Sequence, residues 1–218
     1  MASEGTIDAN IERVTAKESA WGGGVSPFAI GSKKLGMWLF IVSDAITFST
    51  LLICYTYVRV ASEAWPRPFP LWASIANATL MTVVLLSSSL TMVLAVRASA
   101  GGNRSLAVRW LLGTMVGGLG FIILHAHEWL GLIEQGVRLF RNPWQVPLFG
   151  AAFFTLTGLH MFHVGSGVVY LGVIAAGTAR GKFTPEDVEV SGLYWHFVDL
   201  VWMFIFPLVY LLSARVGW

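Results

Sequence analysis

Apolar residues fall in five long runs, separated by short segments rich in polar residues, glycine or proline. The runs cover about residues 35–59, 71–97, 106–134, 148–179 and 194–214. Each is long enough to cross hydrocarbon as a helix, which takes about 20 apolar residues. Strands of membrane barrels are shorter, at about 10 residues, and they alternate polar with apolar positions. Because a helix satisfies its backbone hydrogen bonds within the segment, the pattern predicts an all-α polytopic membrane protein, a bundle of five transmembrane helices.

The segments between the runs have the composition of loops. Residues 61–70 and 138–147 contain prolines, residues 98–105 are small and polar, and residues 180–191 contain Gly181 and Pro185. Residues 1–34 are polar at first and then glycine-rich. The chain is therefore expected to have an N-terminal arm over residues 1–34 and a transmembrane domain over residues 35–218. Pro207, inside the last run, predicts a kink because proline cannot donate to the preceding turn.

Composition and charge support a membrane protein. Only 12% of the 218 residues are charged and 56% are hydrophobic, whereas soluble domains carry about 25% charged residues. The net charge of +2 and the single cysteine, Cys54, exclude a strongly basic nucleic-acid-binding domain and an intrachain disulfide. With the N-terminus inside, nine Lys and Arg residues lie on the inner side and five on the outer side. This excess predicts an inside N-terminus and an outside C-terminus.

Asp44 is the most informative polar residue of the first run. An ionisable side chain within a span is costly and is a candidate functional residue. Asp44 lies about 13 Å inside the run, at 1.5 Å per residue. One interpretation is a carboxyl that conducts protons or contacts another subunit. The other is a hydrogen-bonded acid that locks helices together.

The third run carries His125, His127 and Glu128 near its end. Residues two apart point to different faces of a helix, which disfavours a metal site and favours polar packing at the membrane interface. Asp44 and Glu128 are the candidates for proton uptake or for a subunit interface.

Two further pairs are spaced by three residues, which places each pair on one helix face. His160 and His163 could ligate haem or iron, but packing between helices is favoured. His196 and Asp199 are expected to bond each other and fix a helix end, with Trp195 and Trp202 beside them at interfacial depth. Residues expected to pack helices or contact lipid are His160, His163, His196, Asp199, Asn77 and Thr79. Close helix contacts are expected at Gly113, Gly117, Gly165 and Gly167, and no catalytic or metal-ligating residue is expected.

Four motifs carry a resemblance to a known family. Residues 35–44 read LGMWLFIVSD, residues 124–129 read LHAHEW, residues 157–164 read TGLHMFHV, and residues 194–202 read YWHFVDLVW. In this order they resemble subunit III of haem–copper cytochrome c oxidases. The weaker landmarks between them are Asn77, Thr79 and residues 102–104.

The resemblance implies an accessory subunit without a redox metal of its own. Subunit III of this family packs against subunit I, which holds haem and copper, in a bacterial plasma-membrane complex that reduces O₂ to water and pumps protons. It is expected to support proton uptake, to bind phospholipid, to contact other oxidase subunits and respiratory complexes, and to bind no nucleic acid.

Two departures from the family pattern leave alternatives open. The commonest form has seven helices, so this chain is expected to lack the first two, and Asp44 stands where the family has glutamate. The motifs fit equally the corresponding subunit of a quinol oxidase or a nitric oxide reductase. A stand-alone transporter with a proton relay is disfavoured, because the chain shows no inverted repeats.

Overall fold

A computed structural model describes residues 31–215, so most of the predicted arm, residues 1–30, lies outside the described residues. Within this range, five helices are long and apolar enough to cross a membrane, which confirms the predicted all-α class and the five spans. The long helices are α2 (Ser32–Ala61), α3 (Ala76–Ala100), α4 (Arg104–Glu134), α5 (Pro147–Ala179) and α6 (Pro185–Ile205). Short elements complete the spans: η1 (Leu71–Ile75) before α3, and η2 (Phe206–Tyr210) and η3 (Leu211–Ser213) after α6.

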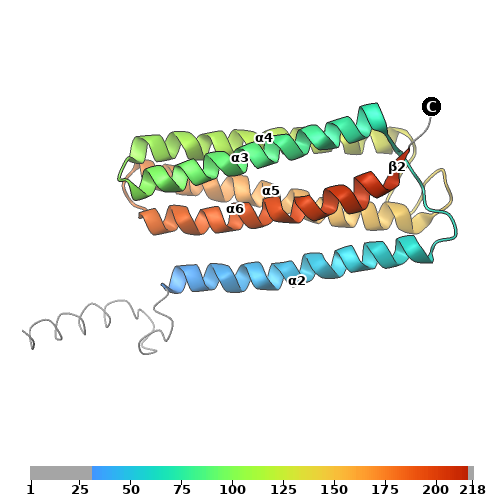
Figure 1. Cartoon of the computed structure of the whole chain (residues 1–218), viewed down its shortest axis with the longest axis horizontal. Coiled ribbons are helices and arrows are strands. Elements are labelled where there is room, and N and C mark those ends of the chain that lie inside the picture. The colour runs from blue at the N-terminus through green and yellow to red at the C-terminus, as the bar shows by residue number, and fades with distance from the viewer. Residues whose placement is uncertain (1–30, 216–218) are drawn as a thin grey trace, which may run out of the picture.

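The helices form two unequal parts (Figure 1). Helices α3, α4, α5 and α6 pack together as a block, and α2 lies along one side of it, against α5 and α6. Ile41, Phe48 and Tyr55 are the residues of α2 that are buried, at a spacing of seven. A spacing of seven returns to nearly the same side of a helix, so α2 contacts the block along one narrow stripe.

The start of α6 corrects the sequence prediction. Residues 180–191 were expected to form a loop, but α6 begins at Pro185. Thr184 and Asp187 form a capping box, in which the Asp187 carboxylate accepts hydrogen bonds from the Thr184 backbone N–H and hydroxyl at 2.8 Å each. These signals start a helix before the continuous apolar run begins. The helix therefore extends beyond its apolar run by about two and a half turns, at 3.6 residues per turn.

The opposite end of the block is closed around Ser213. Its hydroxyl oxygen accepts hydrogen bonds from Arg59 Nη1 at 2.9 Å and from Trp65 Nε1 at 3.3 Å, and it lies 3.4 Å from the Tyr55 hydroxyl. Beside it, β1 (Phe69–Pro70) pairs in parallel with β2 (Ala214–Arg215). The α-helical pattern ends before Pro207 and changes to π geometry in η2. These contacts fasten the C-terminal end of α2 to the end of the last span.

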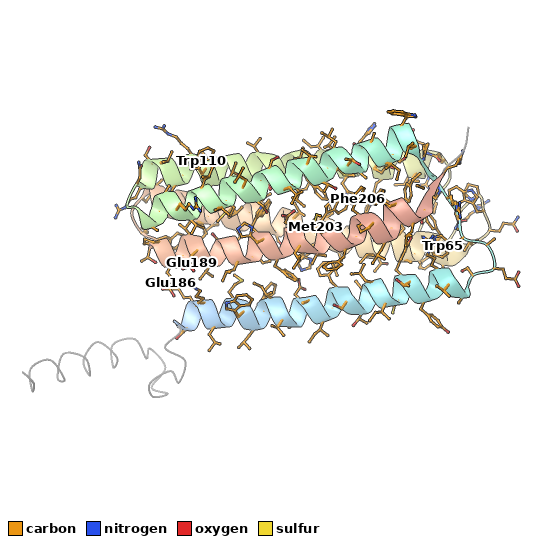
Figure 2. All side chains as sticks on the ribbon, in the orientation of Figure 1. Trp65, Trp110, Glu186, Glu189, Met203 and Phe206 are labelled. Carbon is orange, nitrogen blue, oxygen red and sulfur yellow. The ribbon has the colours of Figure 1, made fainter. Side chains whose placement is uncertain are left out.

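Side chains fill the interior of the block, mainly as aromatic and branched groups (Figure 2). Phe121, Phe153, Trp202 and Tyr210 are fully buried and lie within one aromatic cluster. Edge-to-face pairs dominate, as expected for ring quadrupoles. This packed centre positions the polar side chains described next.

Candidate functional site

Asp44 and His163 meet where α2 packs on α5. His163 Nε2 lies 3.2 Å from Asp44 Oδ2, and the side chains are 11% and 12% exposed. This distance is that of an ion pair, although Asp44 Oδ2 makes no aligned hydrogen bond among the described residues. A small rotation of the imidazole would change the hydrogen-bond angle more than the separation of the two atoms. Two residues that the sequence analysis considered separately are therefore partners.

The hydrogen bond on the other side of the His163 ring constrains the proton of this pair. His163 Nδ1 lies 2.8 Å from the backbone oxygen of Leu159. A carbonyl oxygen can only accept, so Nδ1 must carry a hydrogen. The Nε2 atom then faces Asp44 either with its lone pair or with a second proton. Since two lone pairs repel each other, one proton is held at the contact, on the carboxyl or on the imidazole.

His160 lies on the same helix one turn earlier, but it points into the block. It is fully buried and stacks on Trp202, with ring centroids 5.4 Å apart and planes at 24°. His125, from α4, is also fully buried, and Phe121 packs edge-on against both imidazoles. Neither imidazole has a hydrogen-bond partner among the described residues. His160 and His163 thus occupy different environments, despite the spacing that suggested a common role.

The polar residues of the third run lie on different faces of α4, as their spacing predicts. His125 is buried and His127 is exposed, so the two imidazoles lie on different faces of α4. Glu128 is buried and accepts a hydrogen bond of 3.1 Å from Asn77 Nδ2 on α3. Thr79 bonds only the carbonyl oxygen of Ile75 on its own helix, at 2.8 Å. Glu128 and Asn77 therefore form a contact between α3 and α4, and Thr79 does not join it.

His196 and Asp199 are joined through a third residue. Ser89 Oγ, from α3, donates to Asp199 Oδ2 at 2.8 Å and lies 3.3 Å from His196 Nδ1. Since the hydroxyl proton goes to the carboxylate, the imidazole donates to the serine oxygen. The expected direct bond between His196 and Asp199 is replaced by this bridge. Sequence spacing could not reveal it, because Ser89 lies on a different helix.

The flanking tryptophans belong to the same helix contact, which we call the α3–α6 seam. Trp195 Nε1 donates to Ser88 Oγ at 3.0 Å, and Trp202 Nε1 donates to Thr82 Oγ1 at 2.9 Å. Both indoles are at least 99% buried within the block, so the described helices enclose them. Their N–H groups find partners inside the block instead of at the membrane surface. Three consecutive serines, residues 87–89, were the available sequence signal for the α3 side of the seam.

The four glycines differ in how closely other helices approach them. A Cβ atom at Gly117 would meet Ser88 Cβ at 2.6 Å, and one at Gly167 would meet Trp195 at 3.0 Å. At Gly113 and Gly165 the nearest atoms lie at 3.7 and 4.0 Å, which is ordinary contact. Gly118 was not considered from the sequence, but a Cβ there would meet Trp195 at 2.5 Å. Small residues are thus needed mainly around the Trp195 ring and along α3 and α4.

Metal ligands do not gather in the described part of the chain. Within residues 31–215 no group of three or more His, Cys, Asp or Glu side chains is close enough to hold a metal ion. The polar side chains form pairs and bridges, each between two helices. Such contacts can hold helices together or hold a proton.

Comparison with known sequences gives a consistent result. The model of the family described as "Cytochrome c oxidase subunit III" matches residues 8–214. "Cytochrome c oxidase subunit 3" of Alkalihalophilus pseudofirmus is 33% identical over 186 residues, which cover 84% of this chain and 88% of the relative. "Quinol oxidase subunit 3" of Bacillus subtilis is 31% identical over 182 residues, covering 82% of this chain and 86% of the relative.

A third relative has the same extent of similarity. "Cytochrome bo(3) ubiquinol oxidase subunit 3" of Pseudomonas aeruginosa is 29% identical over 187 residues, covering 84% of this chain and 87% of the relative. Because most of each relative is covered, these proteins are similar in length to this chain. The match to the family also begins at residue 8, well before the motifs that carry the resemblance.

Proposed function

Because this chain belongs to the family of cytochrome c oxidase subunit III, we propose that its Asp44–His163 pair supports proton uptake by the catalytic subunit of its oxidase. The chain is an accessory subunit of a haem–copper oxidase, an oxidoreductase complex of several subunits, and is a multi-pass membrane protein. Subunit III of this family carries no redox metal. A role in the reaction must therefore act through protons, lipid or the stability of the complex.

The observation that supports the proposal is the contact between Asp44 and His163. The imidazole is oriented by Leu159, so the pair has one proton to exchange between two titratable groups. The pair also reaches the surface of the chain, since Asp44 is 12% exposed. The other two buried intramembrane acids are bound within the block, Asp199 by Ser89 and Glu128 by Asn77. Asp44 is thus the intramembrane acid best placed to exchange a proton with a neighbouring subunit.

Substitution of Asp44 by asparagine tests this role in the purified complex. Asparagine keeps the size of the side chain but cannot ionise, so proton uptake should slow, most strongly at alkaline pH where protons are scarce. The haem and copper content should stay unchanged, because those groups are expected in other subunits. The measurements are turnover and turnover-dependent inactivation across neutral to alkaline pH.

The matched control is Asp44→Glu, which keeps an ionisable group at the same place and introduces the residue that the family pattern has there. This variant should retain most of the proton uptake. A nearby polar control is Ser43→Ala, because the Ser43 hydroxyl bonds only the Phe40 oxygen of its own helix. Equal turnover and inactivation in Asp44→Asn and the parent complex at all pH values would refute the proposal.

The partners and the membrane follow from the family. We assign subunit I as the principal contact, phospholipid as a bound component and the bacterial plasma membrane as the location. The relatives that support the last assignment are bacterial oxidase subunits. With the Lys and Arg distribution, the end of the bundle at which α2 begins faces the cytoplasm. Crosslinking of the intact complex and labelling of single cysteines from either side of the membrane test these assignments.

The electron donor has two candidates. Cytochrome c is favoured by the relative from Alkalihalophilus pseudofirmus, and a quinol is favoured by the relative from Bacillus subtilis. The donor binds to other subunits in this family, so the residues of this chain do not distinguish them. Rates of oxidation of reduced cytochrome c and of a quinol by the purified complex decide between the two.

A further inference from the structure

The connection between α4 and α5 is a well-fixed loop. Helix α4 ends at Glu134, and two residues later Gly136 has a positive φ of 85°, a conformation that glycine adopts without strain. Val137 N–H then donates to the Leu132 oxygen at 3.0 Å, and the Val137 side chain is fully buried. This is the Schellman arrangement, with its apolar contact, at a helix C-terminus. The first residues of the loop are thereby held against the block.

Asn142 fixes the second half of the same loop. Its side chain is buried, donates to the Val146 oxygen at 2.6 Å, and accepts from the Trp144 and Val146 backbone N–H groups at 3.1 and 3.2 Å. The backbone N–H of Arg138 also donates to the Arg141 oxygen at 2.6 Å. The backbones of the two arginines are therefore set before any ligand arrives, which lowers the entropic cost of binding.

A cavity of about 620 Å³ opens in this loop. Arg138, Phe140, Arg141 and Gln145 are among the residues that line it, and both arginines are exposed. Neither guanidinium forms an ion pair within residues 31–215, where the ion pairs involve Lys33, Lys34 and His163. Arginine guanidinium groups bind phosphate through two parallel hydrogen bonds. The cavity is thus a concave surface that offers positive charge to an anion.

Apolar side chains beside the cavity set its depth relative to the membrane. Phe140 is 74% exposed, and Leu139 and Leu148 are exposed as well. The loop follows the last turn of one span and precedes the first turn of the next. Exposed apolar groups at this position fit the hydrocarbon boundary, and the arginines beside them then lie at the level of the lipid phosphates. A free phosphate ion has no apolar surface, so it would gain nothing from contact with these side chains.

We propose that this loop is a binding site for the phosphate headgroup of an anionic phospholipid, with Arg138 and Arg141 as the phosphate ligands and Phe140 packed on the upper part of the acyl chains. The site lies outside the four motif stretches and does not involve Asp44. Its occupancy is therefore independent of the proposed role in proton uptake, and either proposal can fail without the other.

The test compares complexes that carry the double variant Arg138→Gln/Arg141→Gln with the parent complex and with Arg67→Gln. Arg67 is an exposed arginine of the loop after α2, at the same end of the bundle, and it does not line the cavity. Phosphatidylglycerol and phosphatidylcholine are titrated into the delipidated complex in detergent, and bound lipid is counted by native mass spectrometry. Inorganic phosphate is used as the competitor.

The parent and Arg67→Gln complexes should bind phosphatidylglycerol equally at this site and in preference to phosphatidylcholine. The double variant should bind it at least about tenfold more weakly, as expected for two arginines near a lipid surface. Equal phosphatidylglycerol binding in all three complexes would overturn the proposal. It would also be overturned if millimolar inorganic phosphate displaced the lipid completely, or if the double variant lost a partner subunit while its lipid count stayed constant. Equal thermal unfolding of the three complexes serves as the folding control.

Discussion

The α3–α6 seam and the contact between α2 and α5 are both built from polar side chains inside a membrane protein. More hydrogen bonds join the helices in the seam, where one carboxylate oxygen, Asp199 Oδ1, has no partner among the described residues. In the seam, Ser88, Ser89 and Thr82 each bond a side chain of α6, and the two tryptophans of the seam are buried. In the contact of α2 with α5, Asp44 and His163 meet at 3.2 Å without an aligned hydrogen bond.

This difference fits a structural role for the seam and the role in proton exchange that we propose for Asp44 and His163. A polar group whose hydrogen bonds are satisfied stabilises one arrangement of the helices and has little reason to exchange its proton. An acid and an imidazole that hold a single proton between them can exchange it at small cost. The motif around Trp195 and Trp202 therefore belongs mainly to folding, and the motif that ends in Asp44 belongs to the proposed activity.

The largest expected effect comes from removing the Trp202 ring, because it contacts His125, His160 and Tyr210. Trp202→Ala should lower the free energy of unfolding by about 3–5 kcal/mol, the cost of a large-to-small substitution in a core. The matched control is Trp72→Ala, since Trp72 is 86% exposed. Thermal unfolding of the complex and its content of this chain are the measurements. Equal losses in the two variants would contradict the assignment of Trp202 to the core.

A smaller effect is expected at Ser89, which bridges His196 and Asp199. Ser89→Ala leaves both partners without their serine bond and should cost about 1–3 kcal/mol. The neighbouring Ser87 is exposed and serves as the control, with an expected change near zero for Ser87→Ala. The chain should be lost from the purified complex more readily in Ser89→Ala. If both serine variants retain it fully, the seam does not depend on the bridge.

The smallest effect is expected at the start of α2. Lys33 and Lys34 pair with Asp187 and Glu189 of α6 at 2.6 and 2.5 Å, but the two lysine side chains keep 60% and 35% of their surface in solvent. Surface ion pairs contribute about 0–1 kcal/mol each. The double variant Lys33→Gln/Lys34→Gln should therefore change unfolding only slightly, and less at high salt. A loss as large as that of Ser89→Ala would mean that these pairs, and not the stripe of Ile41, Phe48 and Tyr55, hold α2 on the block.

The spans and the separate polar residues could be predicted from the sequence, but their partners could not. The predicted run 106–134 agrees with α4 within two residues, because hydrocarbon requires a continuous apolar stretch of fixed minimum length. The start of α6 was missed, because its first turns mix charged residues with Val188 and Val190 and begin at a capping box, so no continuous apolar run marks them. For the site, Asp44 and His163 were each expected to matter, but their contact depends on which faces α2 and α5 turn toward each other.

The sequence by itself therefore determined the class, the five membrane-crossing segments and the family, because these depend on composition along the chain and on the order of the motifs. Only the tertiary structure decided which polar side chains meet and which buried atoms have no hydrogen-bond partner among the described residues. Spacing by three predicts two residues on one helix face, yet in the folded chain His163 contacts Asp44 and His160 packs in the aromatic centre. The packing of α3 on α6 likewise places Ser89 between His196 and Asp199. The rotation of each helix about its axis is set by packing against several neighbours at once, and no local pattern contains that information.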